Sequence, residues 1–447
     1  MQLDPIAKNQ IDVLGSGSAF KIIQPRFRIV IFISLLIFFF LGLRFPFSIG
    51  LIIVIIAFIN YMLLLSFRLS NIEKLPKSLI FSRDTIHDLP TVSVLMPLKN
   101  EGHVIEDTIQ HIIRQDYPVD KMELIIIVEI TDEHTQSALE EINLPTYCKI
   151  ILIPSLNPFT KGRALLHGLK QANHQIITVM DAESHPEPDQ FAKAARLIAS
   201  STELLCLQSK VRISNKNQNW ITRNFATEYF EWFDHFLQQL SNQQFHFGLG
   251  GNSFYIDRKA LVASGAWDPF NVTEDAELSV RLIQSGFSFK LLDSYTDEIC
   301  PDSISNWIYQ RVRWNKGLLI TQFSHLISSL NKKGFDFSHW IHFWLRMTAG
   351  SMLPVFNLFV FIYFLLTWIS PRKAMYADLA MWTLMVVSLV FMILVNWISF
   401  KRLKINKNLL TLIPGAVGYI LLHILAGFWA YYEFLIQPLK WNNTKHE

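Results

Sequence analysis

The chain has 447 residues, of which 51% are hydrophobic and 17% are charged, and its formal net charge is +3. This composition excludes a disordered protein and is not typical of a purely soluble enzyme. A charge so close to neutral, without a long run of Lys and Arg, gives no indication of nucleic-acid binding. Phe and Trp gather near both ends, whereas most acidic residues lie between residues 83 and 303, so we expect a soluble domain between membrane segments.

The N-terminal part predicts a membrane hairpin. Residues 1–26 are mixed and polar, whereas residues 27–68 are almost continuously apolar, and about 40 residues suffice for two crossings. Lys and Arg residues flank the apolar stretch on both sides. The positive-inside rule therefore places residues 1–26, and the domain that follows the hairpin, in the cytoplasm.

Residues 69–338 have the pattern of an α/β domain. Short β-branched runs predict strands over residues 91–97, 123–129, 149–154 and 176–181. Helical periodicity predicts helices over residues 103–115 and 161–172. Polar residues follow these strands, as expected if ligands bind at the carboxyl ends of a parallel sheet.

The C-terminal part predicts further membrane helices. Apolar residues at helical spacing over 316–330 fit a helix in the membrane interface, and they fit a helix that packs on the core equally well. Residues 339–437 contain three apolar blocks, which predict about three crossings before a tail over residues 438–447. The prediction is thus a multi-pass protein of the inner or plasma membrane.

Acidic residues follow three of the predicted strands. Asp181 and Glu183 stand two residues apart after a buried strand, so both point to the same side of an extended segment. Two oxygen ligands on one side suit Mg²⁺ or Mn²⁺ on a diphosphate, although such acids also cap turns. Together with Glu101 and Glu129 after two other strands, they favour a nucleotide site, and no dinucleotide or P-loop glycine motif is present.

Two later segments add candidate chemistry. Glu274 and Asp275 begin a helical stretch, where acids are also favoured by the helix dipole. Gln310, Arg313 and Trp314 share one helical face. They offer an amide, a phosphate-pairing guanidinium and a ring on which a sugar can stack, or else an anchor at the membrane interface.

Taken in order, these segments resemble the family 2 glycosyltransferases, in particular the membrane-embedded processive β-glycan synthases related to cellulose and hyaluronan synthases. The resemblance covers about residues 90 to 320 and implies a Rossmann-like α/β domain of the GT-A type, flanked by transmembrane helices. The segments that carry it are PLKNE with RQDYP, VEITDEHT, TKGRALLHGL, VMDAESHPEPDQF, GLGGNSF, WDPFNVTEDAEL and QRVRWNKG.

The resemblance also implies a role for each candidate residue. Asp275 would be the general base, and Asp181 with Glu183 would hold Mg²⁺ or Mn²⁺. The residues implied on the donor side are Glu101, Glu129, Asp132, Lys161 and Asp181. Those implied on the acceptor and diphosphate side are Glu274, Gln310, Arg313, Trp314, Gly250 and Gly251. Lys161 is equally compatible with a surface position at a helix start, and the glycines with a tight turn.

The activity implied is inverting transfer from a UDP-sugar, UDP-glucose by default, to a growing β-linked polysaccharide that passes between the membrane helices. One alternative is transfer of a single sugar to a polyprenyl-phosphate lipid, and another is a non-catalytic membrane scaffold. The expected partners are the nucleotide-sugar donor, the glycan acceptor, membrane lipid and proteins of an export machinery.

Overall fold

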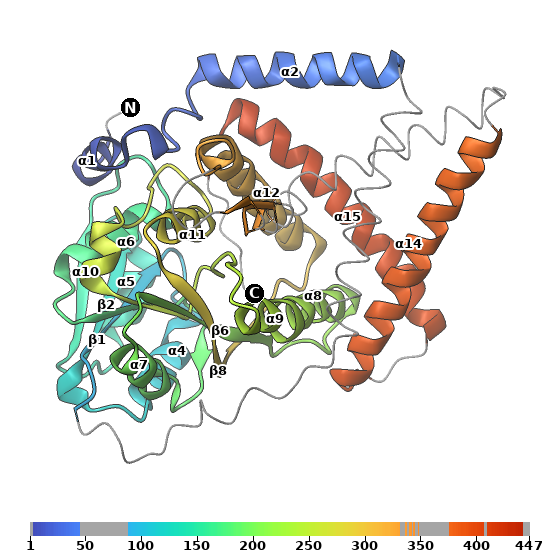
Figure 1. Cartoon of the computed structure of the whole chain (residues 1–447). Coiled ribbons are helices and arrows are strands. Elements are labelled where there is room, and N and C mark those ends of the chain that lie inside the picture. Colours follow the sequence, from blue (N-terminus) through green and yellow to red (C-terminus); the bar gives the residue numbers. More distant parts are fainter. Residues whose placement is uncertain are drawn as a thin grey trace.

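The computed structural model describes residues 3–44, 88–330, 336–337, 339–341, 343–344, 347, 375–405 and 409–440. Its centre is an eight-stranded sheet with the strand order β3-β2-β1-β4-β7-β6-β8-β5 (Figure 1). The strands are β1 Val92–Leu98, β2 Met122–Glu129, β3 Cys148–Ile153, β4 Ile176–Val179, β5 His185–Pro186, β6 Leu205–Ile213, β7 Phe254–Asp257 and β8 Ser288–Glu298. Each of the four predicted strands is present, with its ends within two residues of the prediction.

The first four strands form a parallel sheet, and β7 joins it in the antiparallel direction. In the register of β1 and β2, Leu98 lies beside Val128, so the two strands end at the same edge. Both are continuous apolar runs and almost entirely buried, because helices cover both faces of the sheet. The carboxyl ends of β1, β2 and β4 therefore meet at one edge.

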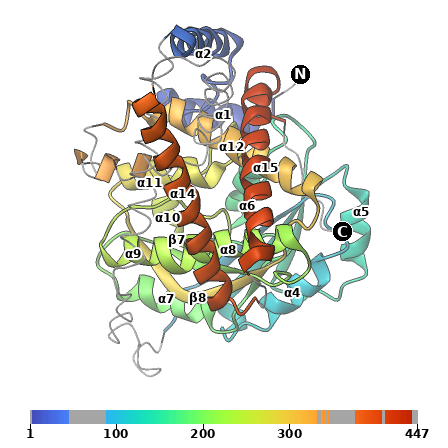
Figure 2. The ribbon, with the colours of Figure 1, turned by 90° about the vertical axis from the view of Figure 1, so that its right-hand side faces the viewer.

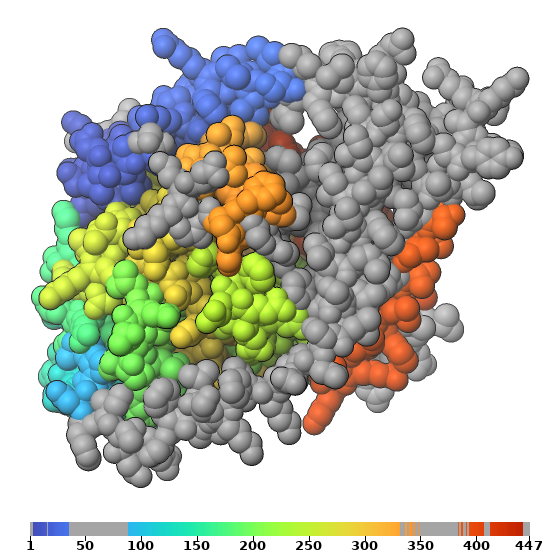
Figure 3. Space-filling model, in the orientation of Figure 1, coloured from blue at the N-terminus to red at the C-terminus, as the bar shows by residue number. Residues whose placement is uncertain are grey.

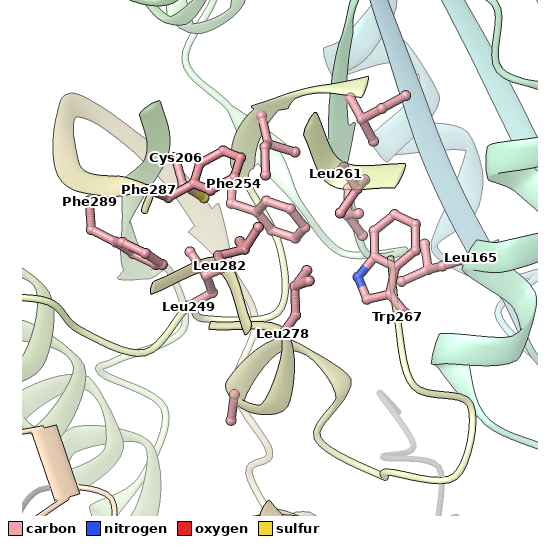
Figure 4. Close-up of a cluster of buried hydrophobic side chains, with 14 of the residues drawn as sticks. Leu165, Cys206, Leu249, Phe254, Leu261, Trp267, Leu278, Leu282, Phe287 and Phe289 are labelled. Carbon is pink, nitrogen blue, oxygen red and sulfur yellow. The ribbon is translucent and has the colours of Figure 1, made fainter. Parts of the chain in front are cut away.

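Two hydrophobic cores lie on the two faces of this sheet. One contains apolar residues of α4 and α7, and the other contains those of α6, α10 and α11. Figure 4 shows the second core, where Trp267 packs near Leu165 of α6 and Leu278 of α11 lies near Leu249. The helices of the α/β domain are α4 Ile105–Ile113, α5 Glu133–Glu140, α6 Lys161–Gln171, α7 Gln190–Ser200, α10 Arg258–Ala263 and α11 Glu274–Gln284, with a short 3-10 turn η3 Val119–Lys121.

A second layer of helices packs beside the domain (Figure 2). It consists of α8 Trp220–Phe230, which continues through a π-helical stretch η4 Glu231–Leu237 into α9 Gln238–Asn242, and of α12 Ile304–His325, α14 Met375–Arg402 and α15 Leu409–Ile436. The helix α12 packs against both α11 and α15. The first part of the predicted helix over residues 316–330 is the second half of α12, whose residues Leu319 and Ile320 are buried.

The N-terminal segment is part of the α/β domain rather than a separate piece. Its helix α1 Pro5–Leu14 and turn η1 Gly15–Gly17 lie beside α6 and α10, and Figure 3 shows the dark-blue N-terminal atoms seated on the yellow-green atoms of this region. Gln10 donates to the Trp267 carbonyl at 3.1 Å, and the Ala19 amide donates to Asp268 at 2.6 Å.

Among the described residues, one helical segment, Leu412–Ile436 within α15, is long and apolar enough to cross a membrane. Leu421, Leu425 and Tyr432 are exposed on it. The first half of the predicted hairpin over residues 27–68 falls on α2 Pro25–Arg44, and the second half lies outside the described residues. Most of the first predicted crossing after residue 339 also lies outside them.

Candidate active site

Glu129 stands at the end of β2 and is held by a buried arginine. Its Oε1 lies 2.5 Å from Nη2 of Arg163, which belongs to the first turn of α6 and is fully buried. The same guanidinium donates to the Pro154 carbonyl at 2.5 Å and lies 3.1 Å from Oδ2 of Asp4. Arg163, itself held by Pro154 and Asp4, thus fixes the orientation of Glu129.

Asp132 links two loops at the same edge. As the N-cap of α5, its carboxylate accepts hydrogen bonds from the amide and the hydroxyl of Thr135, at 3.1 and 2.8 Å. The amide of Asn100, in the loop after β1, donates to it at 2.6 Å. Asp132 therefore shapes the crevice by holding the loops of β1 and β2 together.

Several carboxyl groups crowd the ends of β1 and β4. Burial, followed by the negative charges of Glu183, Asp181 and Asp132, raises the pKa of Glu101 to about 9. The carboxyl group of Glu298, at the end of β8, is buried beside Glu183 and Asp181, and its pKa is also raised, chiefly by burial.

Lys161 connects this acidic cluster to the next loop. Its ammonium group pairs with Asp181 and donates to the Gly251 carbonyl at 2.9 Å. Burial alone would lower the pKa of Lys161, but the carboxylates of Asp181 and Glu274 outweigh it and raise that pKa. Lys161 is thus a largely buried cation in the crevice, which agrees with a place near the phosphates and not with the alternative of a surface lysine.

The acidic cluster fits a divalent cation. Carboxylates crowded together at low exposure repel one another unless a cation or protons neutralise them, and burial together with this repulsion raises the pKa of Glu101. Asp181 and Glu183 offer the oxygen ligands that Mg²⁺ and Mn²⁺ prefer. These two residues are the ones that would hold such an ion, where it would offset negative charge on a diphosphate.

Asp275 approaches the same place from α11. An added Cβ on Gly251, whose φ is +84°, would lie 3.0 Å from Oδ2 of Asp275 and 4.0 Å from Nζ of Lys161. Only glycine lets the loop come this close without a steric conflict. Burial raises the pKa of Asp275 and raises that of its neighbour Glu274 to about 7, although the charge of Lys161 opposes both shifts.

The helix α12 brings the third group of candidates. Arg313 lies close enough to Asp275 and Glu274 to affect their ionisation. Within the described part of the chain, Nε of Arg313 and Oε1 of Gln310 are buried without a hydrogen-bond partner. Buried polar atoms of this kind call for a ligand or a water molecule.

Trp314 lies among aromatic residues of the helix layer. Its ring is 6.4 Å from that of Tyr229 and 6.3 Å from that of Phe225. The guanidinium of Arg311 lies over the ring, 4.4 Å from its centroid, and forms two hydrogen bonds with Glu228 at 2.7 and 2.8 Å. Arg311 therefore anchors α12 to α8.

Gly317 explains how α12 reaches α11. An added Cβ on Gly317 would lie 2.3 Å from Oγ1 of Thr273, the residue before Glu274 and Asp275. At this contact α12 lies so close to the start of α11 that there is no room for a methyl group between them. The glycine of the QRVRWNKG segment therefore fixes the distance between α12 and the acids of α11.

Some contributing residues are absent from the sequence prediction. Arg163 belongs to the TKGRALLHGL segment, two residues after the candidate Lys161. Its place in this segment could have indicated that it lies near the site. Asp4 and Glu298 have no local signal, because their partners lie far away along the chain. Gly250 and Gly251 lie in the loop before β7, where the Gly250 amide donates to Gln208 at 2.9 Å.

The fold and the crevice are those of a glycosyltransferase with a Rossmann-like α/β domain of the GT-A type. The family model described as "Glycosyltransferase like family 2" matches residues 90–317. The chain belongs to this family and is a glycosyltransferase enzyme.

Several known proteins are about a quarter identical to this chain over the regions that align. A protein named probable glycosyltransferase YdaM from Bacillus subtilis is 26% identical over 62% of this chain and 69% of its own length. A β-monoglucosyldiacylglycerol synthase from Synechocystis is 28% identical over 55% of this chain, and a probable glucomannan 4-β-mannosyltransferase from Arabidopsis thaliana is 26% identical over 51%. The chain spans about half the length of these two relatives, 51% and 44%.

A solved structure has the same fold. The mannosyltransferase PcManGT from Pyrobaculum calidifontis, in complex with GDP-Man and Mn²⁺, superposes with a TM-score of 0.58 at 16% identity. The match covers 87% of this chain and 99% of that one. At this identity the likeness concerns the fold.

Proposed function

We propose that this enzyme is an inverting glycosyltransferase that extends a β-linked polysaccharide from a UDP-sugar, with UDP-glucose as the favoured donor. The observation that carries the proposal is the meeting of Asp275 with the Lys161–Asp181 pair at Gly251. A base for the acceptor and a charged site for the diphosphate then lie on the two sides of one loop. Direct displacement needs both and needs no enzymic nucleophile.

The chemistry of the proposal uses the chain's own groups. Asp275 accepts the proton of the acceptor hydroxyl as that oxygen bonds to the anomeric carbon, and the bond from this carbon to the diphosphate breaks. One displacement inverts the configuration, so an α-linked donor gives a β-linked product. Lys161 and Arg313 offset the charge of the departing diphosphate. Mg²⁺ or Mn²⁺ held by Asp181 and Glu183 would supply further positive charge.

The remaining candidate residues receive positions in the same scheme. Glu129 and Asp132 border the end of β2, where the base and ribose of the donor would lie, and Glu101 lies beside the diphosphate. Trp314, Gln310 and the loop of Gly250 border the acceptor. We further propose that the domain faces the cytoplasm, that α15 and other apolar segments cross the membrane, and that the glycan leaves between them toward export proteins.

The second candidate is transfer of one sugar to a lipid. The relative named β-monoglucosyldiacylglycerol synthase matches over 55% of this chain, and the exposed apolar side chains of α15 offer a surface where a lipid acceptor could lie. The acceptor in that case would be a diacylglycerol or, as expected from the sequence, a polyprenyl phosphate. Because the chain belongs to an enzyme family, we do not propose the remaining alternative, a non-catalytic scaffold.

The two acceptors are separated by one experiment. The full-length protein in detergent is incubated with radiolabelled UDP-glucose, and in parallel with other UDP-sugars and GDP-mannose, in Mn²⁺ or Mg²⁺ and with added lipid. Polymeric product that a β-glucanase degrades is expected. Label confined to a chloroform-extractable product would replace the polysaccharide by the lipid acceptor, and labelled polymer from another donor alone would replace UDP-glucose.

A further inference from the structure

A cluster of three metal-ligating side chains lies outside the acidic crevice. Asp107 and His111 stand one turn apart on α4, and His185 belongs to β5. One ligand atom of each lies within 4.8 Å of the other two. Nε2 of His185 is 3.2 Å from one carboxylate oxygen of Asp107, and Nδ1 of His111 is 3.6 Å from the other.

The two imidazole rings lie side by side, with ring centroids 4.1 Å apart and an angle of 11° between their planes. Ligand atoms around a tetrahedral zinc ion are about 3.4 Å apart, given bond lengths of roughly 2.1 Å. The distances of 3.2 and 3.6 Å are close to this value, and they end on the two different oxygens of Asp107. Nδ1 of His111 lies 2.9 Å from the backbone carbonyl of Asp107, so the His111 ring has to rotate away from this oxygen and lose the proton of that nitrogen to bind the ion.

The backbone that carries the three residues is fixed on both sides. Thr108, next to Asp107, donates to the Ala182 carbonyl, and Gln115, one turn after His111, donates to the Glu187 carbonyl at 3.0 Å. These bonds join α4 to the chain just before and just after His185. A ligand set on such a prearranged backbone loses little entropy when it binds an ion.

The ligand types select a different ion from that of the crevice. Two imidazoles and one carboxylate suit Zn²⁺ and related transition metals, whereas Mg²⁺ prefers oxygen ligands. Three protein ligands leave a fourth position for water. The exposed fractions of the side chains, 68% for Asp107, 35% for His111 and 20% for His185, give an ion access from solvent.

We propose that Asp107, His111 and His185 form a second metal site, which binds Zn²⁺ or a similar transition-metal ion and ties α4 to β5. The helix α4 follows the loop that carries Glu101, and β5 follows the segment that carries Asp181 and Glu183. An ion at this site holds together the two segments that supply the acids of the crevice. The ion at this site would be structural, and it would be separate from the Mg²⁺ or Mn²⁺ held by Asp181 and Glu183.

Direct metal binding tests the proposal. The full-length protein in detergent is stripped with a chelator and titrated with Co²⁺ and Zn²⁺ in excess Mg²⁺, which occupies the carboxylate crevice. One tightly bound ion per chain and the visible absorption of Co²⁺ with nitrogen ligands are expected. His111→Ala and His185→Ala should each weaken binding by more than the roughly 10- to 100-fold that loss of an outer-shell partner costs.

Two control variants assign the ion to this place. His174→Ala removes a partly buried histidine near Glu123, at the opposite end of β1, and Asp181→Asn changes the crevice; neither should change Zn²⁺ affinity. Equal melting temperatures of all metal-free variants would show that they fold. Absence of stoichiometric binding, unchanged binding in the His185 variant, or loss of binding in the Asp181 variant would each overturn the proposal.

Discussion

Around α11 and α12 the buried carboxylate of Glu277 is paired with a cation, whereas in the crevice at the strand ends Glu101 and Glu298 lie beside other carboxylates. Glu277 illustrates the first region: Arg281 contacts both of its oxygens, at 2.7 and 2.6 Å, and His325 lies at 2.9 Å. Burial would raise the pKa of Glu277, but the charge and the hydrogen bonds of Arg281, with a further hydrogen bond to His325, lower it to about 2. Glu101, in the crevice, has a pKa of about 9.

The difference between the two regions separates stability from function. A paired buried acid stabilises the fold once its partner is present, and removing either member leaves an uncompensated charge. Crowded acids lower stability until a ligand neutralises them, so their presence points to a ligand. Asp275 and Glu277 stand two residues apart on α11 and yet belong to the two different regions.

Asp275→Asn is the change with the largest expected effect. Loss of the base should lower kcat by roughly 10²- to 10⁴-fold, while the dissociation constant of the donor changes little. The melting temperature should stay equal or rise, because a carboxylate with a raised pKa is removed from a buried place. Radiolabel transfer, donor binding and thermal unfolding measure the three quantities.

The exposed Asp189 provides the control for this substitution, since Asp189→Asn also removes one charge. Turnover of the Asp275 variant within a few-fold of the unmodified enzyme would remove Asp275 from the role of base. A large loss of stability would instead place it with the paired acids of the helix layer.

Glu277→Gln should have the opposite pattern. It leaves Arg281 and His325 buried without their carboxylate, which should lower the free energy of unfolding by about 3–5 kcal/mol. Unfolding in detergent against denaturant measures the change, with Asp189→Asn at an exposed ion pair as the control. Equal stability of the two variants would contradict the distinction between the two regions.

The parallel half of the sheet was predictable because its signals are local. Apolar β-branched runs mark β1, β2 and β4, and the acids after them mark the crevice. The pairing of charges was not predictable, because Asp4 and Arg163 are separated by 159 positions in the chain. The two ionisable residues of the last apolar block face similarly distant partners: Glu433 pairs with Lys316 at 2.8 Å, and His423 lies 3.8 Å from Glu228.

The pH dependence of transfer sharpens the description of the crevice. Asp275 must be deprotonated to act as a base, and its pKa is raised above that of an ordinary aspartate. Activity should therefore be lost on acidification at a higher pH than the usual aspartate value. Lys161→Gln removes a charge that lowers this pKa, so the acid limb of kcat should move further up.

The pH at which kcat falls on acidification is the informative quantity. The maximal kcat is less informative, because Lys161 also contacts Asp181 and its loss affects the donor site directly. Lys193→Gln, at an exposed ion pair with Asp189, serves as the control and should leave the limb in place. A limb that does not move in the Lys161 variant would show that the titrating group is not Asp275.

The N-terminal segment is linked to the crevice through Arg163, and the loss of this link has the smallest expected effect. Asp4 is fully buried; its Oδ2 lies 3.1 Å from Arg163 and 2.9 Å from His167, and Arg163 in turn holds Glu129. In Asp4→Asn the amide oxygen still accepts from Arg163, so the net loss should be about 1 kcal/mol. Because Arg163 orients Glu129, we expect the substitution to raise KM for the donor several-fold and to leave kcat nearly unchanged.

Gln10→Ala, which removes a hydrogen bond from the same segment to Trp267, provides the control. A rise in KM in both variants would mean that the segment acts through its packing. A rise in the Asp4 variant alone traces the effect through Arg163 to the donor.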